Sequence, residues 1–161
     1  MSKKCVFAGT FDPVTRGHEA LISQCLRLFD EVVVAILTNP GKQPYFSLEE
    51  RKEMLNIAMK GNPRVRVIEF DGTIAQLLKN ENTPFYVRGI RNTVDFEYEN
   101  ANYFASKLLN PDMVPIYLPC PQELLHVSSS MVRNSLRFQT PVSDYLTKDV
   151  EEYIALREMK E

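Results

Sequence analysis

Two kinds of apolar spacing alternate along this chain. Short runs rich in β-branched and aromatic residues predict strands, and longer segments with apolar residues three or four positions apart predict helices. The expected strands cover residues 4–8, 31–37, 65–70, 85–88 and 114–118. The expected helices cover residues 17–29, 48–60, 74–78, 94–109 and 148–159, and a further helix begins within 128–130.

The run 31–37 is apolar at consecutive positions, which is typical of a strand buried on both faces in the middle of a parallel sheet. Strands and helices alternate with short connections, so the sequence predicts an α/β fold. We expect a single Rossmann-like domain over residues 1–161, with a parallel five-stranded sheet in the order 3-2-1-4-5 and helices on both faces. Such a sheet has a crevice where the order reverses, and the segments after strands one and four meet there.

Two helices have patterns that predict a buried face or a defined start. In the helix 17–29, the residues expected on one face are Leu21, Cys25, Leu28 and Phe29. The helix 48–60 begins with a capping box, in which Ser47 precedes Glu50 by three positions. Its predicted buried stripe consists of Met54, Leu55, Ala58 and Met59.

Composition and charge exclude several classes of protein. Hydrophobic residues make up 44% and charged residues 25% of the chain, which is ordinary for a globular domain and not for a disordered one. No apolar stretch is long enough to cross a bilayer, so we expect no membrane partner. The formal net charge of −2 argues against general attachment to nucleic acid. The three cysteines have no C-x-x-C spacing, so we expect reduced thiols and a cytoplasmic location.

The first candidate site follows the first strand, where residues 9–18 read G-T-F-D-P-V-T-R-G-H. Gly9 lets the backbone turn sharply and approach a ligand, and Thr10 adds a hydroxyl. Gly17 and His18 open the next helix, where free N–H groups and the helix dipole favour an anion. An imidazole in this place can donate a hydrogen bond to phosphate. The alternative is a tight turn with a histidine that faces solvent.

Cations follow the second and fourth strands. Lys42 lies in the loop 38–46, and loops at the carboxyl ends of a parallel sheet overhang the crevice. In Arg88-Gly89-Ile90-Arg91, which we expect to leave the fourth strand, two arginines flank a glycine and can reach phosphate oxygens without obstruction by a side chain. The alternative is a pair of surface arginines that bridge to Asp95 or Glu97.

Three consecutive serines, Ser128, Ser129 and Ser130, lie where a helix is predicted to start. Serine commonly caps a helix, and we expect one of the three to do so. Three in a row also present hydroxyl and N–H groups to a polyphosphate. This segment is therefore a second candidate anion site.

Together these motifs resemble those of a known family. The segment 9–18 resembles the G-T-F-D-P and T-x-G-H signature of the nucleotidyltransferase superfamily. Residues 88–99 follow the pattern R-G-L/I-R-x-x-x-D-F-E-Y-E, which marks phosphopantetheine adenylyltransferases, and Val127 begins a match to their I-S-S-S motif. Because the resemblance covers nearly the whole chain, the sequence is identified as a member of the phosphopantetheine adenylyltransferase family.

The resemblance implies an enzyme that transfers AMP from ATP to 4′-phosphopantetheine by direct in-line displacement, giving dephospho-coenzyme A and pyrophosphate. It implies catalytic roles for His18, Lys42, Arg88 and Arg91, with His18 stabilising the pentavalent transition state at the α-phosphorus. The residues implied for phosphopantetheine are Thr10, Lys42, Ile74 and Arg88. Those implied for ATP are Thr10, Phe11, His18, Gly89, Ile90, Arg91, Glu99, Leu124, Leu125, His126, Val127, Ser128, Ser129 and Ser130.

Family membership also implies a cofactor and partners. Mg²⁺ would arrive with ATP, and the sequence has no carboxylate cluster that calls for a metal bound by the protein. Members of the family assemble as homohexamers, and coenzyme A is expected as a feedback inhibitor. The chain departs from the family pattern at Ala8, at residues 124–126 and at Ser106, where a proline, an aromatic residue and an asparagine are typical. Two alternatives stay open: another small nucleotidyltransferase with a different phosphorylated acceptor, and a nucleotide-binding module without catalysis.

Overall fold

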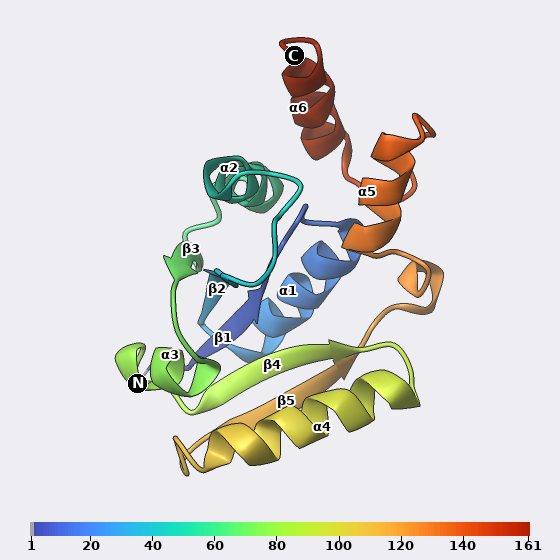
Figure 1. Ribbon diagram of the computed structural model, residues 1–161. Coiled ribbons are helices and arrows are strands. Elements are labelled where there is room, and N and C mark those ends of the chain that lie inside the picture. Colours follow the sequence, from blue (N-terminus) through green and yellow to red (C-terminus); the bar gives the residue numbers. More distant parts are fainter. Residues whose placement is uncertain (1) are drawn as a thin grey trace.

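The chain forms a parallel sheet of five strands that are connected by helices (Figure 1). The structure is a computed structural model that describes residues 2–161. The strands are β1 (Lys4–Gly9), β2 (Glu31–Leu37), β3 (Val65–Phe70), β4 (Phe85–Ile90) and β5 (Val114–Pro119). The helices are α1 (Arg16–Leu28), α2 (Leu48–Met59), α3 (Ile74–Asn80), α4 (Thr93–Lys107), α5 (Ser129–Arg137) and α6 (Lys148–Glu158), with a 3₁₀ turn at Gln122–Leu124.

The strand order is β3-β2-β1-β4-β5, and every neighbouring pair is parallel, which confirms the predicted α/β class and order. The order reverses at β1, where Phe7 lies opposite Val34 of β2 on one side and Val87 of β4 on the other. The segments that follow β1 and β4 therefore leave the sheet next to each other, at its carboxyl edge.

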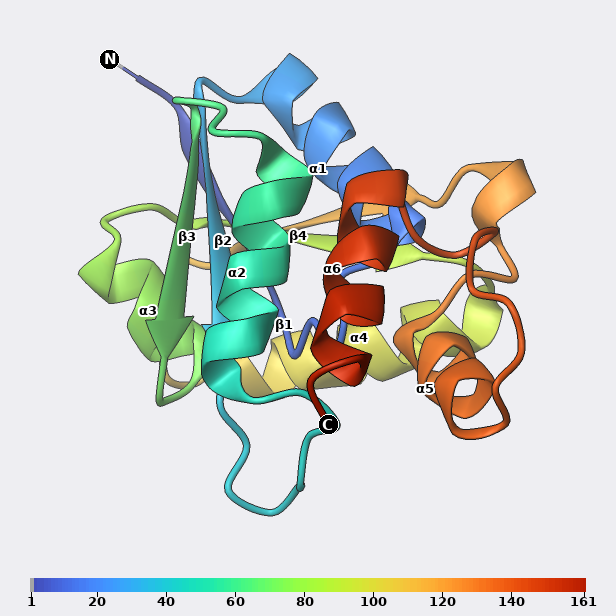
Figure 2. The same cartoon turned by 90° about the horizontal axis from the view of Figure 1, so that it is seen from above.

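Side chains that alternate along the strands form two hydrophobic layers. Cys5 and Phe7 of β1 belong to the layer that contains buried residues of α1, α2, α5 and α6, whereas Val6 and Ala8 belong to the layer of α3 and α4. Figure 2 shows α6 lying alongside α2, in agreement with their contact. Helices thus cover both faces, as the apolar run of β2 predicts. No helix within residues 2–161 is long and apolar enough to span a membrane.

Several element boundaries and buried faces differ from the prediction. β4 continues to Ile90, two residues beyond the predicted end at Arg88, so Gly89 and Ile90 lie within the strand and Arg91 is the first residue after it. α1 begins at Arg16, one residue earlier than expected. The buried residues of α1 include the predicted Leu21 and Cys25 together with Ile22, while Leu28, the last residue of the helix, is 55% exposed.

α2 begins with the predicted capping box. The Ser47 hydroxyl accepts a hydrogen bond from the Glu50 N–H at 3.1 Å, and the Glu50 carboxylate accepts one from the Ser47 N–H at 2.8 Å. Met54 and Leu55 are buried as predicted, whereas Ala58 and Met59 are half-buried and the third buried residue is Arg51. A hydrophobic pattern cannot reveal a buried arginine, because its burial depends on carbonyl groups elsewhere in the fold.

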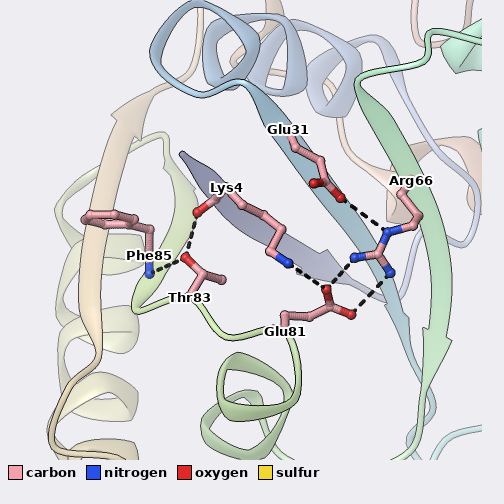
Figure 3. A network of polar contacts seen from close by, with 6 residues as sticks. All are labelled: Lys4, Glu31, Arg66, Glu81, Thr83 and Phe85. Atoms are coloured by element: carbon pink, nitrogen blue, oxygen red, sulfur yellow. Dashed lines mark hydrogen bonds and ion pairs between the residues drawn. The ribbon is translucent and has the colours of Figure 1, made fainter. Parts of the chain in front are cut away.

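A polar network ties the strands together at their amino ends, away from the carboxyl edge (Figure 3). Its members are Lys4, Glu31, Arg66, Glu81, Thr83 and Phe85. Glu81, which caps the end of α3, pairs with Lys4 of β1 at 3.5 Å and with Arg66 of β3. The Thr83 hydroxyl donates a hydrogen bond of 2.6 Å to the Lys4 carbonyl oxygen. These contacts fix the far end of the sheet and leave the carboxyl edge available for a ligand.

Candidate active site

Three cavities open at the carboxyl edge of the sheet. The central cavity, of about 350 Å³, is lined by the turn after β1, the end of β4 and the start of α5. The loop cavity, of about 390 Å³, is lined by the loop between β2 and α2, which projects from the sheet in Figure 2. The helix cavity, of about 510 Å³, is lined by that loop together with residues of α3, β4 and α4. Thr10 lines all three cavities and therefore marks their junction.

The turn after β1 carries an aromatic side chain into the core of this site. Phe11 is buried and has a φ of 49°, a left-handed conformation that is uncommon for residues other than glycine. Such conformations cluster at functional sites, where the surrounding structure holds them. The Phe11 ring centroid lies 4.9 Å from that of His18, in an edge-on arrangement. The imidazole is thus packed against an aromatic edge, which limits its rotation.

His18 also takes part in the cap of α1, which determines its tautomer. The Thr15 N–H donates a hydrogen bond to His18 Nδ1 at 3.0 Å, within a capping box that joins the two residues. Because Nδ1 accepts this bond, the neutral imidazole carries its proton on Nε2, which is then the donor available to a ligand. His18 is half-buried and lines the central cavity, so the alternative of a histidine that faces solvent is wrong.

Burial and positive charge keep this imidazole neutral. Burial is the largest cause that lowers the pKa of His18 to about 4, and the guanidinium groups of Arg88 and Arg91 lower it further. At neutral pH the ring is therefore uncharged and donates through Nε2. A side chain in this state can stabilise charge on a phosphate oxygen without first losing a proton.

Arg88 is held rigidly from two sides. Its Nη1 donates a hydrogen bond of 2.7 Å to the carbonyl oxygen of Ala8, and its Nη2 pairs with Glu99 of α4 at 2.7 Å. The side chain of Arg88 is 29% exposed and lines both the central and the helix cavities, whereas that of Glu99 is 9% exposed. The predicted surface bridge to Asp95 or Glu97 is thus wrong for Arg88, whose partner is a buried carboxylate one helical turn further along.

The structure explains the glycine at position 89 by packing, whereas the sequence suggested free access of the flanking arginines to phosphate. A Cβ atom at this position would lie 2.3 Å from Cδ1 of Leu21 on α1 and 3.3 Å from Sγ of Cys120. The glycine therefore allows α1 to pack closely on β4, as well as lining the central cavity. Because α1 carries His18 and β4 carries Arg88, this close approach brings the two functional side chains together.

Arg91 is the first residue after β4 and is more exposed. Its Nε pairs with Asp95 at 3.2 Å, and the same carboxylate accepts a hydrogen bond from the Arg91 N–H at 3.0 Å. The alternative of a bridge to Asp95 is thus realised for this arginine, while its side chain also lines the central cavity. A surface pair of this kind is weak and can rearrange when a more highly charged ligand arrives.

The remaining cation, Lys42, lies in the loop before α2 and lines the loop cavity. The residue is exposed. Asp12, Arg51 and Arg133 line the same cavity. The structure therefore brings Lys42 to the junction at Thr10, although it lies outside the lining of the central cavity.

The serine segment caps α5 beside the same turn. The Ser128 hydroxyl accepts a hydrogen bond from the Met131 N–H at 3.2 Å, which confirms the predicted capping role. The Ser129 hydroxyl donates a bond of 2.8 Å to the carbonyl oxygen of Pro13. Both serines line the central cavity together with His18. A neutral donor, two guanidinium groups and a helix N-terminus around one cavity are groups that can bind a polyphosphate.

Comparison with known proteins identifies the family. Residues 6–135 match a family model described as cytidylyltransferase-like. The phosphopantetheine adenylyltransferase of Methylobacillus flagellatus is 36% identical over 154 residues, which are 96% of each chain. That of Aliivibrio fischeri is 42% identical over 135 residues, or 84% of each chain, and that of Helicobacter pylori is 36% identical over 155 residues, covering 96% and 99%. The chain belongs to the phosphopantetheine adenylyltransferase family.

The fold is also similar to that of a solved structure. A protein from Vibrio parahaemolyticus, provisionally assigned as a nicotinate-nucleotide adenylyltransferase, superimposes with a TM-score of 0.72 over 96% of this chain and 93% of that one. The two sequences are 21% identical, so this comparison concerns the fold alone. It agrees with the parallel α/β arrangement described above.

Not every residue that the family pattern implies lines the central cavity. Leu124 and Val127 are buried in its wall, whereas four further residues implied for ATP lie outside the lining: Ile90, Leu125, His126 and Ser130. Ile74 lines the helix cavity together with Arg88 and Thr10, so these three implied acceptor residues do come together. The roles of the four residues outside the lining stay predictions.

Arg133 is a candidate site residue that sequence reasoning missed. It lines both the central and the loop cavities, and its guanidinium donates to the carbonyl oxygen of Asp12 at 2.8 Å and to the Ser130 hydroxyl at 3.0 Å. The available signal was its position on the helix: a residue four positions after Ser129 shares its face. The side chain adds a third guanidinium to the walls of the site.

Glu19, beside His18, provides a test of the packing around the start of α1. Burial is the main cause that raises the pKa of Glu19 from 4.5 to about 7, and one carboxylate oxygen has no hydrogen-bond partner among residues 2–161. The side chain of Thr147 and the charges of Arg16 and Lys60 oppose the rise, whereas Asp149 adds to it. The folded protein therefore binds more protons than the unfolded chain between these pH values, and its free energy of unfolding falls as pH rises through them.

We expect Glu19→Gln to be more stable than the unchanged protein at about pH 8, by on the order of 1 kcal/mol, because solvent screens part of the charge of this partly exposed carboxylate. The amide has nearly the same shape but carries no charge that must be buried. Denaturant unfolding across the pH range measures the difference, which should vanish below about pH 4, where both unfolded and folded carboxyls are protonated. Glu97→Gln, at an exposed position of α4, is the control and should change little. A constant difference at all pH values would contradict this origin.

Proposed function

We propose that this protein transfers AMP from ATP to 4′-phosphopantetheine, releasing dephospho-coenzyme A and pyrophosphate. The observation that carries the proposal is the junction at Thr10, where the central cavity meets the loop and helix cavities. A transfer between two phosphorylated substrates requires two anion sites that share a border, with cations on both sides. Arg88, which lines the central and helix cavities, supplies a cation at that border.

ATP occupies the central cavity in this proposal. Its α-phosphate lies within reach of His18 Nε2, and its β- and γ-phosphates lie toward Arg91 and the start of α5. The wall formed by Ser128, Ser129 and Arg133 supports this orientation, because hydroxyl groups, a helix N-terminus and a guanidinium all favour the leaving pyrophosphate.

Phosphopantetheine binds across the other two cavities. Its phosphate is held by Lys42, Arg88 and the Thr10 hydroxyl, and its pantetheine arm extends past Ile74 into the helix cavity. Tyr103 and Ser106 of α4 line that cavity and would contact the arm. The volume of about 510 Å³ supports an acceptor longer than glycerol phosphate.

The reaction needs positioning and positive charge rather than a general base. A phosphate monoester with a second pKa near 6 is largely dianionic at neutral pH, so the nucleophile has no proton that must be removed. The barrier is the repulsion between this dianion and the triphosphate, together with the entropy of alignment. Fixed cations at Lys42, Arg88 and Arg91 lower the repulsion, and the neutral His18 donates a hydrogen bond to the oxygen that gains charge.

We propose that Mg²⁺ is bound by the phosphates of the nucleotide, because the acidic residues of the central cavity are already engaged by other groups of the protein. Asp12 accepts hydrogen bonds from two backbone N–H groups, Asp95 pairs with Arg91, and Glu99 pairs with Arg88. These carboxylates already have partners within the chain, and residues 2–161 contain no group of three or more metal-binding side chains. Mg²⁺ bound to phosphate oxygens would supply charge neutralisation on the leaving group.

We also propose a cytoplasmic homohexamer that coenzyme A inhibits. Apolar side chains on α4 and at the start of β5 support an assembly, because Val94, Phe104 and Val114 are 70%, 59% and 43% exposed, and Leu108 just beyond the helix is 86% exposed. Coenzyme A carries both an adenine nucleotide and a pantetheine arm, so it would compete for the central and helix cavities. Free thiols at Cys5, Cys25 and Cys120 agree with a reducing compartment.

The function is tested by measuring pyrophosphate release. We expect product only when ATP and phosphopantetheine are both present. Nicotinate mononucleotide and glycerol phosphate serve as the alternative acceptors. Comparable turnover with either one would assign the protein to a sister activity, and ATP binding without any turnover would leave a nucleotide-binding module.

We expect the binding of ATP and the binding of phosphopantetheine to depend on different cationic side chains. Lys42→Ala should weaken phosphopantetheine binding, and Arg91→Ala should weaken ATP binding, each by about 1.5–3 kcal/mol, or roughly ten- to a hundredfold. Separate calorimetric titrations of the two ligands measure these effects. Arg27→Ala, an exposed arginine near the end of α1, is the control for loss of a positive charge. The assignment of Lys42 fails if its removal changes only the affinity for ATP.

A further inference from the structure

The segment Thr10–Pro13 is bound on one side by the loop that carries Lys42 and by α2. Asp12 is 5% exposed, and its two carboxylate oxygens accept hydrogen bonds from the N–H groups of Tyr45 at 2.8 Å and of Phe46 at 2.9 Å. Each oxygen thus binds a separate backbone donor at the end of this loop. The bonds join the turn after β1 to the chain three and four residues beyond Lys42.

A second buried charge completes this attachment. Arg51 of α2 is also 5% exposed, and its Nη1 donates to the carbonyl oxygen of Thr10 at 3.0 Å. Its Nε donates to the carbonyl oxygen of Ser47, the residue that caps α2, at 3.4 Å. The guanidinium thus links the turn after β1 to the residue that begins α2. Residues 2–161 contain no carboxylate that forms an ion pair with Arg51, so its charge is satisfied by backbone carbonyl groups.

Burying two charged side chains without an ion pair costs free energy. Such residues are retained where their hydrogen bonds hold the main chain in one conformation. Here both side chains bind main-chain groups. Those of Tyr45, Phe46 and Ser47 follow Lys42 in the chain, and the fourth belongs to Thr10. Thr10 lines all three cavities, and Asp12 and Arg51 both line the loop cavity with Lys42. The two contacts thus attach the end of the Lys42 loop to the turn that carries Thr10.

We propose that Asp12 and Arg51 are positioning residues for the acceptor phosphate. They hold the Lys42 loop against the turn that carries Thr10, so that the two groups meet the phosphate of the acceptor together. This inference rests on the proposed function, because it assigns the loop cavity to the acceptor side. When either contact is lost, Lys42 and Thr10 are both still present, but their relative position is no longer fixed.

The nucleotide side of the same turn has attachments of its own. Arg133 donates to the carbonyl oxygen of Asp12, and Ser129 donates to that of Pro13. Both bonds use backbone acceptors, so a change to the Asp12 side chain leaves them intact. Of the three cavities, Arg51 lines only the loop cavity, whereas Asp12 also lines the central cavity. Arg51→Gln is therefore the change whose effect is directed to the acceptor, with ATP binding preserved.

The test uses Asp12→Asn and Arg51→Gln in the full chain. An asparagine can accept only one of the two N–H bonds, because its amide nitrogen faces the other donor. We expect the KM for phosphopantetheine to rise roughly tenfold in each variant, since one hydrogen bond to a charged group has that worth. In Arg51→Gln the dissociation constant of ATP, measured by calorimetry without acceptor, should change less than about twofold. Arg51→Lys should recover part of the loss, because the ammonium can still donate to Thr10.

A control for loss of a guanidinium that binds backbone carbonyl groups is available at the opposite edge of the sheet, at an exposed arginine. Arg64 also donates through Nη1 to two backbone carbonyl groups, those of Leu26 at 3.0 Å and Phe29 at 3.5 Å. Arg64→Gln removes the same kind of contact far from the three cavities. We expect it to leave both substrate constants unchanged. An equal rise in the acceptor KM for Arg64→Gln would show a general loss of stability and overturn the proposal.

Hydrogen exchange separates this inference from the proposed function. The amides of Tyr45 and Phe46 should be protected in the unchanged protein and should exchange at least about tenfold faster in Asp12→Asn. Unchanged protection would overturn the attachment, as would equal weakening of ATP and acceptor binding. If the unchanged protein released no pyrophosphate with ATP and phosphopantetheine, the proposed function would fail, whatever the exchange rates showed.

Discussion

His18→Ala is expected to lower kcat by roughly 10²–10³-fold, or about 2.7–4 kcal/mol, by analogy with removal of one oxyanion donor. The affinities for ATP and phosphopantetheine should change little, because the contact strengthens only as charge develops on the α-phosphate. The geometry supports this role, since Nδ1 is occupied by the Thr15 N–H and only Nε2 can donate into the central cavity. Single-turnover kinetics under saturating substrates would measure the chemical step directly.

The pH dependence distinguishes a hydrogen-bond donor from a general base. With a pKa of about 4, His18 stays neutral throughout the physiological range and adds no step to the rate profile there. The rate should instead rise with pH through about 6, as the acceptor phosphate becomes dianionic, and then level off. His18→Gln should keep the same profile and recover part of the rate, because an amide can donate but cannot act as a base. A profile that lost its rising limb in this variant, or an adenylate trapped on His18, would contradict the mechanism.

The fold could be predicted because its elements depend on local patterns. The consecutive apolar residues of β2 indicated a central parallel strand, and the Ser47–Glu50 spacing located the start of α2. Polar residues at strand ends then indicated the crevice, where Thr10, His18, Arg88 and Arg91 do line one cavity. These inferences succeed because strand order alone decides which chain segments meet at the carboxyl edge.

Other features of the site depend on contacts between distant segments. The close approach of Leu21 that requires Gly89 could not be inferred, because it depends on how α1 packs against β4. The burial of Arg51 likewise depends on the carbonyl oxygen of Thr10, 41 residues away in sequence. Arg133 was missed because the sequence indicates where a helix begins but not which cavity its later side chains line. That depends on how the helix packs on the rest of the fold. Hydrophobic spacing contains no information on such polar partners.

The last prediction concerns Arg88 and Glu99, which combine a structural and a binding role. Arg88→Met should destabilise the fold by about 3 kcal/mol, because it leaves the carboxylate of Glu99 buried without its partner. It should also weaken phosphopantetheine binding by roughly ten- to a hundredfold, since a charged hydrogen bond to the phosphate is lost. The pKa of His18 should rise in this variant but stay below its ordinary value, because burial, the larger cause, is unchanged.

The double variant Arg88→Met/Glu99→Gln separates the two roles. Glutamine removes the buried charge, so the free energy of unfolding should recover by most of the amount lost in Arg88→Met. Phosphopantetheine affinity should stay low, because no cation returns to the border between the central and helix cavities. Chemical denaturation and calorimetry on the two variants, with Glu99→Gln alone as the control, measure both quantities. If acceptor affinity returned with stability, the weakening would have come from a disturbed fold, and Arg88 would have no direct part in holding the acceptor phosphate.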